Sequence, residues 1–169
     1  MNSQIKSRER VSLHGEVFTA EREVKAMCDL VNTQCRDYKA KFLEPACGDG
    51  NFLAEILSRK LQSINSESDY VTSSLIALSS LYGIDIQQDN VDSCIKRLFD
   101  IWEQSGEFED RIKIQARYIL QNNIVCADFL KPESINLYDW EINSQGTTRT
   151  KANNLEYLIT GQRRIDYDS

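Results

Sequence analysis

Apolar residues along the first 130 positions alternate between runs at helical spacing and short continuous runs. Apolar side chains that recur every three or four positions predict helices over residues 20–38, 51–64, 71–81, 88–104 and 108–120. Short apolar runs bounded by turn residues predict buried strands over 41–44, 81–86 and 123–129. Strands and helices that alternate in this way predict an α/β fold with a parallel sheet and helices on both faces, of the doubly wound, Rossmann-like kind.

The pattern decays after Leu130, and Leu155–Ile159 is the one later apolar run, which we interpret as a fourth strand. The chain therefore divides into an N-terminal segment (1–19), an α/β domain (20–142) and a tail (143–169).

Composition narrows the class of protein. The chain has 169 residues, of which 41% are hydrophobic and 27% charged, as in ordinary globular domains. Its apolar runs are too short to span a bilayer and its first residues do not resemble a signal peptide, so we expect a cytoplasmic protein without membrane contact. The five cysteines include no CxxC pair, which argues against a disulfide scaffold and against a zinc site.

The net charge of −6 is concentrated in the middle of the chain. Residues 61–142 carry 6 basic and 14 acidic side chains, a local charge of −8. Because DNA affinity depends on neutralising phosphates, this region is a poor surface for DNA. Contact with DNA would therefore need a partner chain or a complete enzyme assembled with one, or would involve the ends of this chain.

The loop that follows the first predicted strand has the residues of a ligand site. It reads Glu44-Pro45-Ala46-Cys47-Gly48-Asp49-Gly50, with a helix directly after it, so the backbone and the helix amides can approach a ligand. It is not the dinucleotide pattern GxGxxG, because the third glycine is missing and Asp49 would repel a pyrophosphate. Cys47 is interpreted as a small loop residue rather than a nucleophile.

The other two predicted strands also end in residues that suit a nucleoside. Asp85 ends the second strand, where a carboxylate can accept from both ribose hydroxyls. Asp128 and Phe129 end the third, where a carboxylate can accept from an exocyclic amino group and a ring can stack on a purine. Ligands bind at the carboxyl ends of parallel strands, so the three ends together predict a site for S-adenosyl-L-methionine or its demethylated product.

These segments resemble the motifs of the N6-adenine-specific DNA methyltransferases of restriction–modification systems. Residues 44–53 resemble motif I, and residues 14–19 upstream resemble motif X, which is the gamma-type order. Residues 83–86 are similar to motif II and residues 126–130 to motif III. The resemblance implies a class I S-adenosylmethionine-dependent methyltransferase fold, present in part, with residues 20–142 as the cofactor-binding domain and the motif X-like loop in residues 1–19.

The resemblance also implies a role for each matching residue. Phe18 and Thr19 would close over the methionine part of the cofactor, although the family usually has proline where Ala20 stands. Asp85 would hold the ribose, Asp128 would bind the adenine amino group, and Phe129 would line the adenine face. Close backbone approach would come from Ala46, Gly48 and Gly50, with Glu44 nearby.

The catalytic motif of that family, Asn-Pro-Pro followed by an aromatic residue, is missing. The only prolines are Pro45 and Pro132, and neither belongs to such a motif. We therefore assign no catalytic residue and no metal, and two hypotheses stay open. The chain is either the S-adenosylmethionine-binding part of an adenine-specific DNA methyltransferase, completed by a second methyltransferase or restriction subunit, or a catalytically inactive cofactor-binding module or truncated remnant.

Overall fold

Three parallel strands form the central sheet of the protein. The structure is a computed structural model and describes residues 19–65 and 69–160. The strands are β1 (Phe42–Glu44), β2 (Leu81–Asp85) and β3 (Ile124–Cys126), in the order β1-β2-β3. The predicted α/β class and the parallel sheet are confirmed, and each strand lies within the range predicted for it.

Helices precede the three strands and connect them. They are α2 (Glu21–Leu30), α3 (Asn32–Arg36), α4 (Asn51–Ser63), α5 (Tyr70–Ser79), α6 (Gln88–Gln104) and α7 (Asp110–Asn123). The single helix predicted over 20–38 is in fact α2 and α3, because the backbone of Val31 leaves the helical region at φ −124° and ψ 35°. No described helix is both long enough and apolar enough to cross a membrane.

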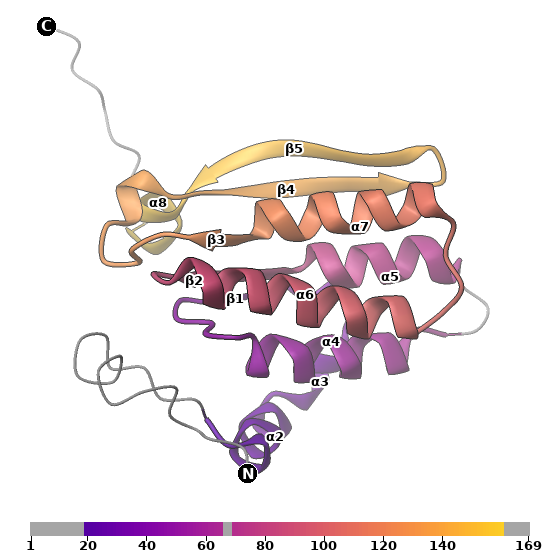
Figure 1. Cartoon of the computed structure of the whole chain (residues 1–169), viewed down its shortest axis with the longest axis horizontal. Coiled ribbons are helices and arrows are strands. Elements are labelled where there is room, and N and C mark those ends of the chain that lie inside the picture. The colour runs from indigo at the N-terminus through magenta and orange to yellow at the C-terminus, as the bar shows by residue number, and fades with distance from the viewer. Residues whose placement is uncertain (1–18, 66–68, 161–169) are drawn as a thin grey trace, which may run out of the picture.

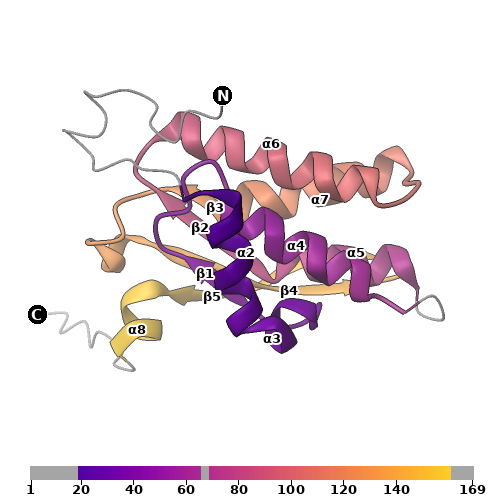
Figure 2. The same ribbon diagram turned by 90° about the horizontal axis from the view of Figure 1, so that it is seen from below.

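The two faces of the sheet are covered differently. Gly83 faces Cys47 and Leu53, on the side that α4 and α6 cover. Tyr82 and Ile84 point to the opposite face, as alternation along a strand requires, and join a smaller apolar cluster with Ile135, Leu137 and Leu155. Figure 2 shows α6 and the C-terminal helix α8 on opposite sides of β1, β2 and β3.

A hairpin that the sequence pattern did not predict lies on this second side and supplies Leu137 to the cluster. After the short 3-10 helix η1 (Pro132–Ser134), strands β4 (Asn136–Asn143) and β5 (Gly146–Asn154) pair antiparallel. Figure 1 shows this hairpin beside α7, on the side of the molecule away from α2 and α3. The boundary predicted at 142/143 falls at the tip of this hairpin, and the two strands pair across it.

The prediction of a fourth strand at Leu155–Ile159 is wrong, because Leu155–Thr160 is the helix α8. Leu155 is fully buried, whereas Leu158 and Ile159 are 51% and 55% exposed. A short apolar run does not by itself distinguish a strand from a helix. Here only the first residue of the run reaches the core.

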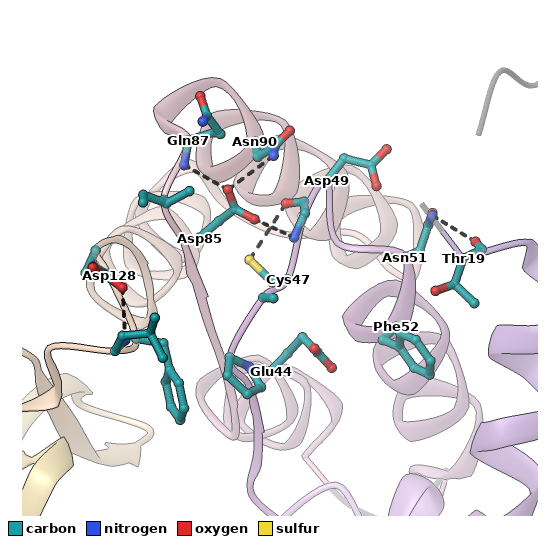
Figure 3. Close-up of a pocket in the computed structure, with 17 residues that line it drawn as sticks. Thr19, Glu44, Cys47, Asp49, Asn51, Phe52, Asp85, Gln87, Asn90 and Asp128 are labelled. Carbon is teal, nitrogen blue, oxygen red and sulfur yellow. Dashed lines mark hydrogen bonds between the residues drawn. The ribbon is translucent and has the colours of Figure 1, made fainter. Parts of the chain in front are cut away.

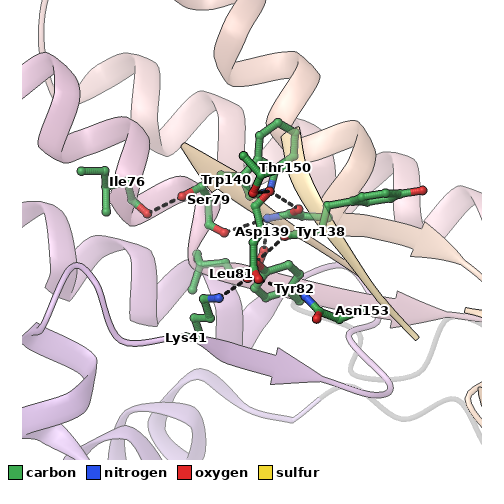
Figure 4. Close-up of polar contacts among 11 residues, drawn as sticks. Lys41, Ile76, Ser79, Leu81, Tyr82, Tyr138, Asp139, Trp140, Thr150 and Asn153 are labelled. Carbon is green, nitrogen blue, oxygen red and sulfur yellow. Dashed lines mark hydrogen bonds and ion pairs between the residues drawn. The ribbon is translucent and has the colours of Figure 1, made fainter. Parts of the chain in front are cut away.

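Buried polar groups join the hairpin to the sheet and to α7 (Figure 4). Asn123 is fully buried, and its Nδ2 donates to the carbonyls of Ser79 and Leu81, at 3.0 Å each. Its Oδ1 accepts from Nε1 of Trp140 at 2.8 Å. Tyr82 donates its hydroxyl to the carbonyl of Tyr138 at 2.8 Å. These contacts satisfy the buried polar atoms and fix where the hairpin lies.

Candidate functional site

The carboxyl ends of all three parallel strands open into one cavity of about 440 Å³. This size lies within the range of small-molecule sites, roughly 300–1,000 Å³. Figure 3 shows the lining side chains converging from the loop after β1, the end of β2 and the segment after β3. The lining residues are Thr19, Glu44–Asp49, Asn51, Phe52, Asp85–Gln87, Asn90 and Ala127–Leu130.

The loop between β1 and α4 is held in place by the neighbouring strand and by its own turn. The N–H of Cys47 donates to the carbonyl of Ile84 at 2.9 Å, and the N–H of Gly50 donates to the carbonyl of Cys47 at 2.9 Å. Gly48 and Gly50 have φ values of 54° and 89°, a left-handed backbone that residues with a Cβ rarely adopt. The loop therefore needs glycine at these two positions, and α4 begins directly after them.

Asp85 connects the end of β2 to this loop and to α6. Its Oδ2 accepts from the backbone N–H of Gly48 at 3.0 Å. Its Oδ1 accepts from the N–H of Gln87 at 2.8 Å and from Nδ2 of Asn90 at 3.1 Å. A carboxylate offers about four acceptor sites, so Asp85 retains acceptor capacity after these three bonds.

Most of the predicted site residues lie at the cavity. Its lining includes Thr19, Glu44, Ala46, Gly48, Asp85, Asp128 and Phe129. Gly50 is at the turn behind the lining and forms the N-cap of α4. Phe18 lies outside the described residues. Asp128 accepts from the N–H of Leu130 at 3.0 Å and lies 3.9 Å from Nζ of Lys131.

Burial changes the acid–base properties of two groups in the cavity. It raises the pKa of the Glu44 carboxyl, an effect that the N–H of Ala46 partly opposes. A hydrogen bond with Cys94, together with burial, raises the pKa of the Cys47 thiol well above its ordinary value. A raised pKa disfavours the thiolate, which is the nucleophilic form of cysteine.

Sequence reasoning missed the contribution of α6. Asn90, Cys94 and Arg97 follow one another at helical spacing and all contact the site. Nη2 of Arg97 donates to Oδ2 of Asp49 at 2.8 Å. The other oxygen, Oδ1 of Asp49, is buried and has no hydrogen-bond partner within the part of the chain that the structure describes. The spacing of these three residues on a predicted helix was the signal that could have identified them.

The cavity is acidic. Its lining contains four carboxylates, those of Glu44, Asp49, Asp85 and Asp128, and no lysine, arginine or histidine among the described residues. A phosphate or pyrophosphate would meet repulsion there, whereas a ligand with cationic groups and hydroxyl donors would be attracted. Within residues 19–65 and 69–160, no group of three or more histidine, cysteine, aspartate or glutamate side chains is arranged so that it could hold a metal ion.

Comparisons with known proteins found no matching family model, no similar curated protein and no similar solved structure. The fold and the site define an α/β protein with a cavity at the carboxyl ends of a parallel sheet.

Proposed function

We propose that this chain is the S-adenosyl-L-methionine-binding part of an adenine-specific DNA N6-methyltransferase. The observation that carries the proposal is the acidic cavity at three strand ends, without a basic lining residue among those described. S-adenosylmethionine is a nucleoside without phosphate, and its sulfonium and ammonium groups are cationic. Its charge is therefore the one that such a cavity favours, whereas dinucleotides and nucleoside triphosphates carry the charge that it repels.

The positions of the acceptors fit the parts of that ligand. Asp85 has acceptor capacity left for ribose hydroxyls, and Asp128 with Phe129 lies at the neighbouring strand end for the adenine. Glu44 and Asp49 lie on the β1 side of the cavity, where acceptors for an ammonium group are needed.

DNA as the methyl acceptor rests on the resemblance of four segments to the adenine methyltransferase motifs. The Asn-Pro-Pro-aromatic motif that would bind the target adenine is not among the 169 residues. Residues 61–142, at a charge of −8, also disfavour DNA. A second polypeptide that carries the missing motif and a basic surface would supply both functions.

A methyl-transfer assay tests this division of labour. The chain is incubated with methyl-labelled S-adenosylmethionine and unmethylated DNA, alone and with a methyltransferase polypeptide that carries the Asn-Pro-Pro-aromatic motif. We expect N6-methyladenine only in the mixture, and no product when the chain carries Asp128→Ala. Transfer by the chain alone would contradict the need for a second polypeptide.

The missing catalytic motif also favours a second candidate, a module that binds the cofactor and transfers nothing. Cofactor binding without transfer in either arm of the assay would support this candidate over the first.

A further inference from the structure

One face of the N-terminal part of α6 lies against the candidate site. Asn90, Cys94 and Arg97 are spaced at i, i+4 and i+7 and therefore lie on the same side of the helix. Asn90 donates to Asp85. Cys94 packs closely against Gly50, since a Cβ added to this glycine would lie only 2.7 Å from the sulfur of Cys94. The helix thus contacts the site at three successive points, and Arg97 is the last of them.

The guanidinium of Arg97 joins two parts of the site that are separate in the chain. Nη2 donates to Oδ2 of Asp49 in the loop after β1, and Nη1 donates to Oδ1 of Asn51 at the start of α4. Because a guanidinium has only donors, it fixes which way the Asn51 amide points. Oδ1 of Asn51 faces Arg97, and Nδ2 is left to donate to the carbonyl of Thr19 at 3.5 Å.

The contacts that run from Arg97 through Asn51 to Thr19 lie at one end of the cavity only. Figure 3 shows Asp85 and Asp128 at one end, and Thr19, Asn51 and Phe52 at the other. Without Arg97, the Asn51 amide can rotate and Asp49 loses its cationic partner. Both changes occur away from Asp85 and Asp128, so the two ends respond differently to a substitution at Arg97.

We propose that Arg97 is a positioning residue that holds Asp49, Asn51 and Thr19 in place at the end of the cavity that takes the amino-acid part of the ligand. The inference rests on the proposed function, in which the nucleoside lies at Asp85 and Asp128. Arg97 itself is not among the lining residues, so it acts through its neighbours.

Comparing two ligands on the same variants tests this role. S-adenosylhomocysteine fills both ends of the cavity, whereas adenosine lacks the amino-acid part. Arg97→Met is expected to weaken S-adenosylhomocysteine binding about tenfold, the scale of a hydrogen bond to a charged group. Adenosine binding, followed by NMR titration because it is weak, should change by less than about twofold because Asp85 and Asp128 keep their contacts. Arg97→Lys keeps a charge for Asp49 but lacks the second nitrogen that reaches Asn51. Its affinity for S-adenosylhomocysteine should lie between those of the parent and Arg97→Met.

Matched variants separate positioning from general damage. Lys96→Met removes the neighbouring cation, which pairs with Asp100 on the surface of α6, and should leave both affinities unchanged. Asn51→Ala should weaken S-adenosylhomocysteine binding and be non-additive with Arg97→Met, because both break one chain of contacts. Equal weakening of the two ligands by Arg97→Met, or parental affinity for both, would overturn the inference. A parent chain that fails to bind S-adenosylhomocysteine would instead contradict the proposed function, and the inference with it.

Discussion

The carboxylate of Asp85, at the end of β2, accepts a hydrogen bond from the backbone N–H of Gly48 at 3.0 Å. With its other oxygen it accepts from Gln87 and Asn90 at the start of α6. One carboxylate therefore ties together the glycine loop, a strand end and a helix, and it does so on the wall of the cavity. Its role in shaping the site and its predicted role toward a ribose cannot be separated by removing the side chain.

Asp85→Asn tests this relationship with little change in shape. An amide has a single acceptor oxygen, so its NH2 group must face either Gly48 or the donors at the start of α6. We expect a loss of about 1–3 kcal/mol in the free energy of unfolding, the cost of a buried donor left without an acceptor. Asp92→Asn, the same change on the exposed side of α6, should cost less than about 0.5 kcal/mol. Urea unfolding measures both, and equal stability of the two variants would contradict this account of Asp85.

Gly50→Ala is expected to destabilise the glycine loop for two independent reasons. The φ of 89° costs a residue with a Cβ about 1–2 kcal/mol, and the new Cβ would lie 2.7 Å from the sulfur of Cys94. We expect a total loss of about 2–4 kcal/mol in unfolding free energy. In the double variant with Cys94→Ala the contact with the sulfur disappears, while the backbone cost and the 3.3 Å approach to the Cβ of residue 94 remain. Its loss should therefore be smaller than the sum of the single losses, and simple additivity would show that the contact does not matter.

The Asn123 side chain is expected to be the strongest polar link between the sheet and the hairpin. Asn123→Ala removes three buried hydrogen bonds and leaves Nε1 of Trp140 without its acceptor. The expected cost is about 3 kcal/mol in the free energy of unfolding. Asn122→Ala is the matched control, because the Asn122 amide donates to the carbonyl of Tyr118 and accepts from Arg149, and both of these residues are exposed. It should cost less than about 1 kcal/mol, and a similar loss in both variants would argue against the role of Asn123.

Lys60 makes stability depend on pH. It is fully buried, its Nζ donates to the carbonyls of Asp37 and Ala40 at 2.6 Å each, and burial lowers its pKa to about 8. The neutral amine still has two hydrogens for these two carbonyls. Between pH 8 and the ordinary lysine pKa the unfolded chain binds more protons than the folded one, so stability rises with pH.

The size of this effect follows from comparing the parent with Lys60→Met. The parent should gain about 2 kcal/mol relative to the variant between pH 8 and pH 10. The quantity to compare is the difference in unfolding free energy between the two proteins. Burial raises the pKa of the Cys28 thiol to about 12, which lowers the stability of both proteins above the ordinary thiol pKa and cancels in this difference. Parallel pH profiles would contradict a buried, pKa-shifted Lys60.

Strand ends could be predicted from the sequence because their residues are close together in the chain. Each predicted strand was a short apolar run, and the polar residues after it, such as Asp85 and Asp128, follow directly. In a parallel sheet these ends meet at one edge, and most of the predicted site residues line one cavity there. The order of residues along the chain and the topology of a parallel sheet are therefore sufficient to predict which strand ends form the cavity.

The hairpin and the α6 contacts could not be predicted in the same way. Period-2 alternation in β4 is interrupted by a register irregularity between Tyr138 and Trp140. Residues 146–154 of β5 include Ala152 as their only hydrophobic residue, so the apolar pattern that marks a half-buried strand is missing. Arg97 has a role only through partners 46 and 48 positions away, which a motif search along the chain does not compare.

The central claim is that the acidic cavity binds S-adenosylmethionine or its demethylated product, and an isothermal calorimetric titration tests it most directly. The parent chain is titrated with S-adenosylhomocysteine and, separately, with NAD⁺, which shares the adenosine but carries a pyrophosphate. We predict saturable binding of S-adenosylhomocysteine at one site per chain, at least about tenfold tighter than NAD⁺, because like charges at close range disfavour the pyrophosphate. Tighter binding of NAD⁺, or no binding of S-adenosylhomocysteine, would contradict the account.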